Sequence, residues 1–229
     1  MKTKIIAFEG VDGSGKGTQS ELLYKYLKEH GYDAYLIANP RYGTPQCRIV
    51  ESFLQGELDI KNPYTIASIF STERALTYET EWKQIYDGGD RIIIMDRYIG
   101  SNMFHQLARL EKEEWPSFLR WIRGYEYGAL HLPMPDITIF LDVHPAVIQE
   151  NIHARAVHEN SSPDVNERDS DYMYACSIAA HYCARTDKWR RILCTRNIST
   201  NQFEMMDPRA IHHLVRDELV KGGIIRGTS

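Results

Sequence analysis

The stretch Phe8-Glu9-Gly10-Val11-Asp12-Gly13-Ser14-Gly15-Lys16-Gly17-Thr18 decides the fold of this 229-residue chain. It contains a glycine, four further residues and then Gly-Lys, and it joins an apolar run to a segment of helical period. Glycines let the backbone turn tightly and point successive N–H groups at phosphate oxygens, and the N-terminus of the following helix adds partial positive charge. A phosphate-binding loop is therefore predicted, rather than a glycine-rich turn without a ligand. Its nucleotide-binding residues are Gly10, Val11, Asp12, Gly13, Ser14, Gly15, Lys16, Gly17 and Thr18.

The residue after the lysine departs from the usual loop pattern. A serine or threonine is expected there, whereas this chain has Gly17 followed by Thr18. Either Thr18 supplies a hydroxyl near Mg²⁺, or the metal is held mostly by water and phosphate. Carboxylates beside a polyphosphate would repel it unless Mg²⁺ intervenes, so Asp12 and Asp96 are the candidate metal-binding residues.

The rest of the chain alternates short β-branched runs with longer segments of helical period, a pattern typical of an α/β fold with a parallel sheet flanked by helices. No linker or repeat divides it, so a single domain is expected over residues 1–229. The expected strands are Lys4–Glu9, Ala34–Ala38, Arg91–Asp96, Ile137–Leu141 and Arg191–Thr195. The expected helices are about Lys16–Glu29, Tyr64–Tyr86, Ser101–Lys112, Ser117–Tyr127, Pro145–Ala156, Asp169–Lys188 and Pro208–Val220.

A polar, irregular segment at about residues 157–168 interrupts this alternation. A loop of that length inside an enzyme is typical of a mobile lid, and an idle surface loop is the alternative.

Composition limits the classes of partner. The net charge of −4 gives no general attraction to nucleic acid or to an anionic membrane. No apolar run approaches the roughly 18 residues of a membrane helix, and the stretch from Ile5 to Phe8 is too short for a signal peptide, so a cytoplasmic location is expected.

The four cysteines form no Cys-x-x-Cys pair, and buried, reduced thiols are expected. A zinc site at Cys176, Cys183 and His181 is the alternative, although the spacing is not that of a zinc motif.

Further segments, taken with the phosphate loop, resemble the thymidylate kinase family of P-loop nucleoside monophosphate kinases. The resemblance covers nearly the whole chain in the right order. The segments that carry it are Phe8–Gly13, Pro40-Arg41-Tyr42-Gly43, Phe70 with Arg74, Asp96-Arg97-Tyr98 followed by Ser101-Asn102, and Leu132–Asp136.

This resemblance implies a three-layer P-loop kinase fold with a five-stranded parallel sheet, in which the first and third strands are neighbours. It implies direct in-line transfer from ATP, with Mg²⁺, to dTMP, and it implies a homodimer. The implied catalytic residues are Lys16, Asp12, Arg97 and a lid arginine, because the loop carries no extra basic residue. Arg155 and Arg168 flank the polar segment and are the candidates.

The acceptor nucleotide is expected to bind a separate set of side chains. In this resemblance Phe70 stacks on the base, Arg74 and Asn102 hydrogen-bond its edge, and Arg97 and Arg41 hold its phosphate. Many family members have a tyrosine where this chain has His105, so the ribose hydroxyl is expected to be excluded less strongly, unless His105 only packs in the same place. The full implied set is Arg41, Tyr42, Phe70, Arg74, Arg97, Ser101, Asn102 and His105.

Three other functions are open at this stage. The first alternative to a dTMP kinase is a kinase for dUMP or for a broader range of deoxynucleotides. The second is a nucleotide-binding protein with weakened catalysis, and the third is a nucleotide-dependent switch. The switch is disfavoured, because the sequence lacks the guanine-reading Asn-Lys-x-Asp segment.

Overall fold

A five-stranded parallel sheet forms the centre of the computed structural model, which describes residues 2–159, 166, 169–200 and 202–227, with the backbone alone at 153–159. The strand order is β2-β3-β1-β4-β5, so the expected pairing of the first and third strands is confirmed. In that pair Lys4 lies opposite Ile92 and Phe8 opposite Asp96. The strands are β1 (Lys4–Glu9), β2 (Ala34–Ala38), β3 (Ile92–Asp96), β4 (Ile137–Asp142) and β5 (Arg190–Leu193).

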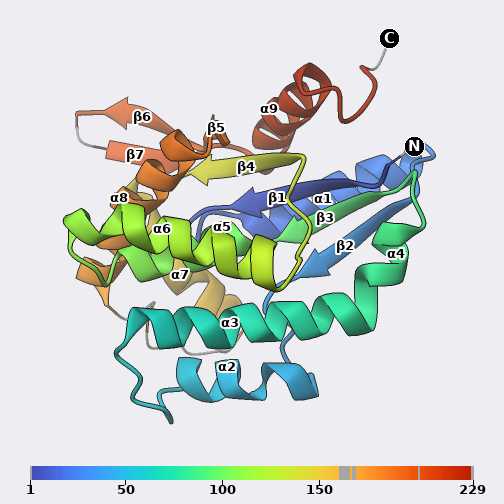
Figure 1. Cartoon of the computed structure of the whole chain (residues 1–229). Coiled ribbons are helices and arrows are strands. Elements are labelled where there is room, and N and C mark those ends of the chain that lie inside the picture. The colour runs from blue at the N-terminus through green and yellow to red at the C-terminus, as the bar shows by residue number, and fades with distance from the viewer. Residues whose placement is uncertain (1, 160–165, 167–168, 201, 228–229) are drawn as a thin grey trace.

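Helices cover both faces of this sheet (Figure 1). On one face α1 (Lys16–Glu29) packs against α9 (Pro208–Lys221). On the other, α5 (Ile99–Leu107) contacts α3 (Pro63–Thr77), α6 (Trp115–Arg123) and α8 (Ser170–Thr186). The remaining helices are α2 (Arg48–Leu54), α4 (Lys83–Asp87), α7 (Pro145–Glu159) and short 3₁₀ turns at Pro45–Cys47 and Lys112–Glu114.

The central strands are buried because helices lie on both sides of them. Ile5, Ile6 and Phe8 of β1 and Ile93 and Ile94 of β3 are fully buried. Near-continuous apolar strands of this kind are typical of parallel sheets. The rigid sheet fixes where the loops at the carboxyl ends of β1 and β3 begin.

The long helix expected at residues 64–86 is interrupted. After α3 the chain forms a π-helical turn at Tyr78–Trp82, and α4 follows it. Tyr78 and Trp82 are both buried, with ring centroids 4.5 Å apart. Residues four apart share a face in an ordinary α-helix as well, so the spacing of these two rings does not distinguish the π-helical turn from a continuous helix. A second π-helical segment, Gly124–Ala129, follows α6, which ends before the predicted boundary at Tyr127.

A β-hairpin near the C-terminus was not predicted. Strands β6 (Thr195–Ser199) and β7 (Gln202–Met205) pair antiparallel outside the main sheet, and β5 ends at Leu193 instead of Thr195. The hairpin is fastened by Phe203, whose ring stacks on His144 with centroids 3.6 Å apart.

The predicted lid is only partly covered by the structure. Residues 157–159 belong to α7, which continues past the predicted end at Ala156. Residues 160–165 and 167–168, among them Arg168, lie outside the described residues.

Two expectations from composition can be compared with the described residues. No helix there is both long and apolar enough to cross a membrane. All four cysteines are buried and free, as expected, and the described part of the chain holds no cluster of three potential metal ligands.

Candidate active site

The loop between β1 and α1 turns where only glycine fits. A Cβ at Gly10 would lie 2.8 Å from the carbonyl oxygen of Leu141, and one at Gly13 would lie 2.9 Å from that of Ile148. Gly13 also has a left-handed φ of 77°, which costs glycine little. From α7, Asn151 donates a 2.8 Å hydrogen bond to the Gly13 carbonyl oxygen. The loop is therefore held from both the sheet and α7.

Lys16 lies inside this loop. Its ammonium group donates 2.8 Å hydrogen bonds to the carbonyl oxygens of Gly10 and Val11, and the residue is 4% exposed. Burial and the nearby Arg97 guanidinium lower the pKa of Lys16 to about 8. The ammonium is thus already desolvated at the mouth of the loop, where phosphate oxygens would enter.

Arg97 follows the carboxyl end of β3 and forms an ion pair with Asp12 of the loop. Burial alone would raise the pKa of Asp12, but Arg97 and Lys16 hold it well below its ordinary value. Arg97 has an unusual φ of 63°, fixed by hydrogen bonds from Arg97 N to Phe8 O (3.1 Å) and from Asn39 Nδ2 to Arg97 O (2.9 Å). The neighbouring strands therefore bring a partly buried arginine to the phosphate loop.

A cleft of about 770 Å³ opens over these residues. The phosphate loop lines it together with Asp96 and Arg97, and the hairpin and α9 contribute Met205, Pro208 and Ile211. Its size is that of a cofactor pocket, and its lining combines the glycines of the phosphate loop with Lys16 and Arg97. Such a lining suits a polyphosphate.

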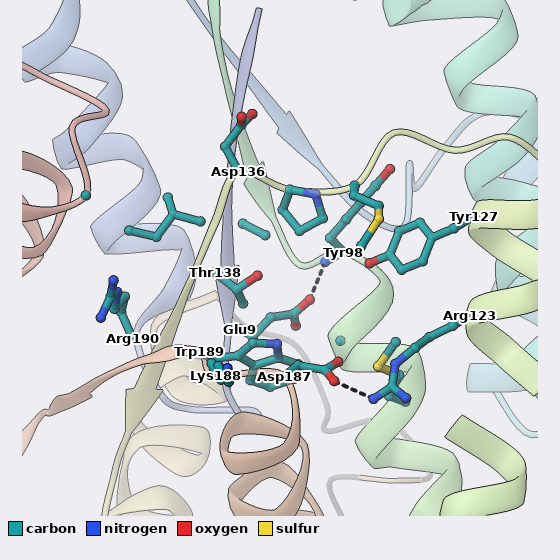
Figure 2. A pocket seen from close by; sticks show the side chains of 17 residues that line it. Glu9, Tyr98, Arg123, Tyr127, Asp136, Thr138, Asp187, Lys188, Trp189 and Arg190 are labelled. Atoms are coloured by element: carbon teal, nitrogen blue, oxygen red, sulfur yellow. Dashed lines mark hydrogen bonds and ion pairs between the residues drawn. The ribbon is translucent and has the colours of Figure 1, made fainter. Parts of the chain in front are cut away.

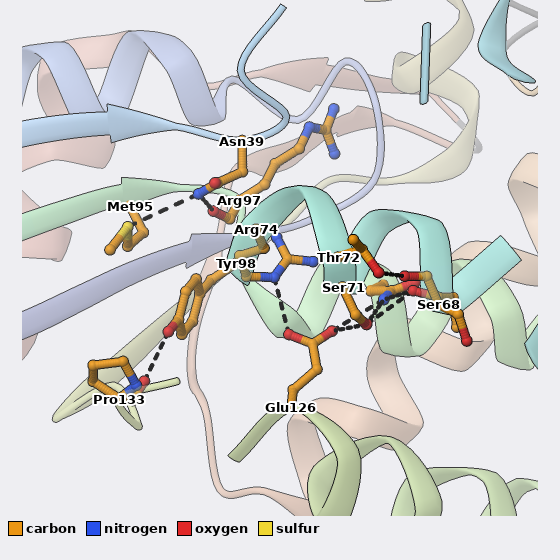
Figure 3. Close-up of polar contacts among 12 residues, drawn as sticks. Asn39, Ser68, Ser71, Thr72, Arg74, Met95, Arg97, Tyr98, Glu126 and Pro133 are labelled. Atoms are coloured by element: carbon orange, nitrogen blue, oxygen red, sulfur yellow. Dashed lines mark hydrogen bonds and ion pairs between the residues drawn. The ribbon is translucent and has the colours of Figure 1, made fainter. Parts of the chain in front are cut away.

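A second polar cluster lies beside α3 and α5 (Figure 3). The Glu126 carboxylate, fully buried on the π-helical segment after α6, accepts hydrogen bonds from Arg74 Nε (3.0 Å), Ser71 Oγ (2.7 Å) and Asn102 Nδ2 (3.1 Å). Phe70, one turn before Arg74, is half-buried and meets Phe53 edge-on. The cluster gathers residues from three helical elements.

Known proteins resemble this chain in sequence and in fold. The family model for thymidylate kinase matches residues 8–199. A thymidylate kinase of Mycobacterium tuberculosis is 32% identical over 171 residues, which cover 73% of this chain and 79% of the relative. The chain belongs to the thymidylate kinase family.

Two further comparisons extend over most of the chain. A thymidylate kinase of Tropheryma whipplei is 28% identical over 211 residues, covering 92% of this chain and 95% of the relative. The crystal structure of a thymidylate kinase from Ehrlichia chaffeensis superposes with a TM-score of 0.64, covering 96% of this chain and 100% of that one. At 22% identity this likeness shows the fold alone.

Several residues expected at the thymidylate kinase site have protein partners. Arg41 pairs with Glu81 (Nη2 to Oε2, 2.8 Å), and Tyr42 on the same loop is 61% exposed. Ser101 donates to the buried Glu9 carboxylate.

Thr18 is exposed, whereas a Cβ at Gly17 would lie 3.3 Å from Asp96 Oδ2. The side chain of Arg155, on α7, is not described.

Asn102 differs most from expectation. Its Nδ2 donates to Ala67 O, Ser71 Oγ and Glu126 Oε1 at 3.0–3.2 Å, and its Oδ1 accepts from Gln106 Nε2 at 3.4 Å. Both ends of the amide are therefore bound inside the protein, which leaves the second lone pair of Oδ1 for the expected contact with a base edge.

His105 lies directly beside the phosphate loop. Its Nε2 is 3.8 Å from Asp12 Oδ2, and its Nδ1 is 3.1 Å from the Tyr172 hydroxyl. Burial, with the repulsion of Arg97, lowers the pKa of His105 to about 3 in spite of Asp12, so the ring is neutral near pH 7.

Glu9 was missed as a functional candidate. It is 1% exposed, accepts from Tyr98 N at 3.0 Å, and its burial raises its pKa. Figure 2 shows that Glu9 also reaches a separate cleft of about 540 Å³ between β1, β4 and the π-helical segment. Its place directly before Gly10, at the end of an apolar strand, was the available signal.

Glu126 was missed as well. It stands four residues after Ile122 and eight after Phe118, which are both buried on α6. A carboxylate on an apolar stripe was the signal that marks it.

Proposed function

We propose that this chain phosphorylates dTMP to dTDP with ATP as the phosphoryl donor. One arrangement carries the proposal: Lys16 in the phosphate loop and Arg97 after β3 lie together over the carboxyl ends of paired strands. Asp12 pairs with Arg97 and lies near enough to Lys16 to affect its pKa. Ligands of open α/β sheets bind at that edge. A donor phosphate on the loop and an acceptor phosphate at Arg97 then meet above the sheet.

Direct in-line transfer needs positioning and charge neutralisation more than a protein acid or base. Lys16 leaves its loop carbonyls to bind the β- and γ-phosphates, and its desolvated charge counters the charge that develops on the transferred group. Arg97 binds the acceptor phosphate while Asp12 holds its guanidinium in place. Arg155 stays our candidate for the lid arginine, and closure of the lid keeps water from accepting the phosphoryl group.

Mg²⁺ fits this loop through Asp96 better than through Asp12. The ion prefers oxygen ligands and commonly uses one or two carboxylates with substrate phosphates and water. Asp12 is engaged by Arg97, whereas Asp96 Oδ2 lies beside Gly17, at the position that lacks the usual hydroxyl. When bound, Mg²⁺ would supply positive charge that offsets the negative charge of the phosphates.

The acceptor base is proposed to lie between Phe70 and Arg74, with Arg41 and Tyr42 near its phosphate. Arg41 must exchange Glu81 for that phosphate, which a charged ligand favours. A homodimer and a cytoplasmic location stay predictions.

A coupled ADP-release assay with ATP and a panel of nucleoside monophosphates tests this function. We expect the highest kcat/KM for dTMP, a lower one for dUMP, and one at least about 10²-fold lower for dCMP, whose amino group would face the donors of Arg74. A dCMP or purine value equal to that of dTMP would contradict the proposal.

A further inference from the structure

Glu126 is a fully buried carboxylate outside the phosphate loop. It is 0% exposed and lies on the π-helical segment Gly124–Ala129 behind α3 and α5. A charge without water is costly unless it is paired and hydrogen-bonded. Glu126 meets that requirement with three donors, two of them from α3 and one from α5.

The bond to Arg74 uses only one side of its guanidinium. Glu126 Oε2 accepts a hydrogen bond from Arg74 Nε at 3.0 Å. The Arg74 guanidinium also lies over the Tyr98 ring, with its Cζ 5.6 Å from the ring centroid. Neither terminal nitrogen of Arg74 makes a hydrogen bond to any described residue. The guanidinium is thus fixed at its inner edge while its outer donors stay available.

Asn102 and Ser71 complete the support. Both donate to Glu126 Oε1, at 3.1 and 2.7 Å, and Asn102 Nδ2 also lies 3.2 Å from Ser71 Oγ. Oε1 is thereby occupied, and Oε2 is the oxygen left to Arg74. One carboxylate therefore orders donors from both helices, and the Asn102 amide has a use that requires no nucleotide.

We infer that Glu126 is a positioning residue that orients Arg74 toward the base of the acceptor nucleotide, with Ser71 and Asn102 holding Glu126 in turn. The inference rests on the proposed function, because it assigns the outer donors of Arg74 to the base carbonyl. In this arrangement the choice of thymine over cytosine depends on a residue that never touches the nucleotide.

The variant Glu126→Gln tests the inference because the amide keeps the shape and loses the charge. Its NH₂ group then faces a donor, either Arg74 or Asn102, so the guanidinium loses its fixed plane. We expect the dTMP-to-dCMP ratio of kcat/KM to fall by about tenfold or more, mainly through the KM for dTMP, while the affinity for a non-hydrolysable ATP analogue stays within about twofold. In an Arg74→Ala background the same change should leave the ratio unaltered.

Asp187→Asn is the matched control. Asp187 pairs with Arg123 in the lining of the separate cleft, to which α3 contributes no residue, and the substitution also removes a carboxylate from an arginine. Its thermal midpoint should fall without any change in the ratio. If Glu126→Gln does not fold, Ser71→Ala removes a single bond to Glu126 and should lower the ratio in the same direction.

The outcomes separate the two claims. A wild-type enzyme without preference for dTMP would contradict the proposed function and the inference together. A selective wild type, with a folded Glu126→Gln or Ser71→Ala variant that keeps the wild-type ratio, would overturn the inference alone. A lowered thermal midpoint with an unchanged ratio would likewise mean that Glu126 only stabilises the fold.

Discussion

Arg97 has two roles in a single conformation, since it forms an ion pair with Asp12 and also lines the cleft. Its left-handed φ is held by hydrogen bonds from both neighbouring strands, so its position does not depend on a ligand. Preorganised charge of this kind is what phosphoryl transfer requires.

Arg97→Ala should weaken use of the acceptor and leave ATP binding nearly intact. We expect kcat/KM for dTMP to fall by about 10²-fold or more, because a bidentate charge is lost. Titration of an ATP analogue should give close to wild-type affinity. Arg91→Ala, which removes a surface pair with Asp33, is the control and should change neither value. A large loss of ATP affinity in Arg97→Ala would place this residue on the donor side.

The variant His105→Tyr tests how the site discriminates between deoxyribose and ribose. The wild-type ring is neutral and lies near Asp12, on the acceptor side of the loop. A tyrosine would crowd the 2′ position, so the ratio of kcat/KM for dUMP over UMP should rise several-fold, and dTMP should remain the best substrate. An unchanged dUMP-to-UMP ratio would mean that His105 only fills space.

At the scale of elements, α7 is more than a neighbour of the lid, because Asn151 fastens the phosphate loop through Gly13 O. Asn151→Ala should raise the KM for ATP by about two- to tenfold, the equivalent of one hydrogen bond, and leave the KM for dTMP unchanged. Gln149→Ala, an exposed change on the same helix, should leave both constants unaltered. Equal changes in both KM values would indicate general loosening of α7.

The sequence predicted the elements that follow simple periodicity. The strands from β1 to β4 were predicted to within about one residue, because apolar runs beside glycines and charges mark their ends. The two π-helical segments could not be predicted, since the spacing of apolar residues such as Tyr78 and Trp82 is the same in a continuous α-helix. The hairpin was missed because β6 is polar and largely exposed.

The same distinction holds for the site. The phosphate loop was readable because its chemistry is local in sequence. The cluster around Glu126 was not, because Ser71, Asn102 and Glu126 lie on separate elements and come together only in the folded chain.

At the scale of the whole molecule, the largely buried, neutral His105 makes the fold sensitive to acid. Its pKa is about 3 when folded, against an ordinary value of 6.5. As the pH falls below 6.5 the unfolded chain takes up a proton there and the folded chain does not, so the free energy of unfolding decreases by up to about 1.4 kcal/mol per pH unit. Asp12 affects the free energy of unfolding at lower pH, because the stability that it contributes is lost only as the pH falls below 3.8, the ordinary pKa of an aspartate.

Urea unfolding between about pH 7 and pH 5 checks this sign. The wild-type free energy of unfolding should fall more steeply with acid than that of His105→Tyr. The pKa of His212 is also lowered, to about 4, but it is common to both proteins, so the difference isolates His105. Parallel curves would contradict a neutral imidazole at His105 in the folded chain.

Transfer of a label from the γ-phosphate of ATP to dTMP tests the central claim most directly. Wild type should place the label in dTDP rather than in inorganic phosphate. Lys16→Ala should slow that transfer by about a thousandfold, the effect of about 4 kcal/mol of unshielded transition-state charge. Label found only in inorganic phosphate, or a folded Lys16→Ala variant that retains more than about a tenth of the wild-type rate, would contradict the account.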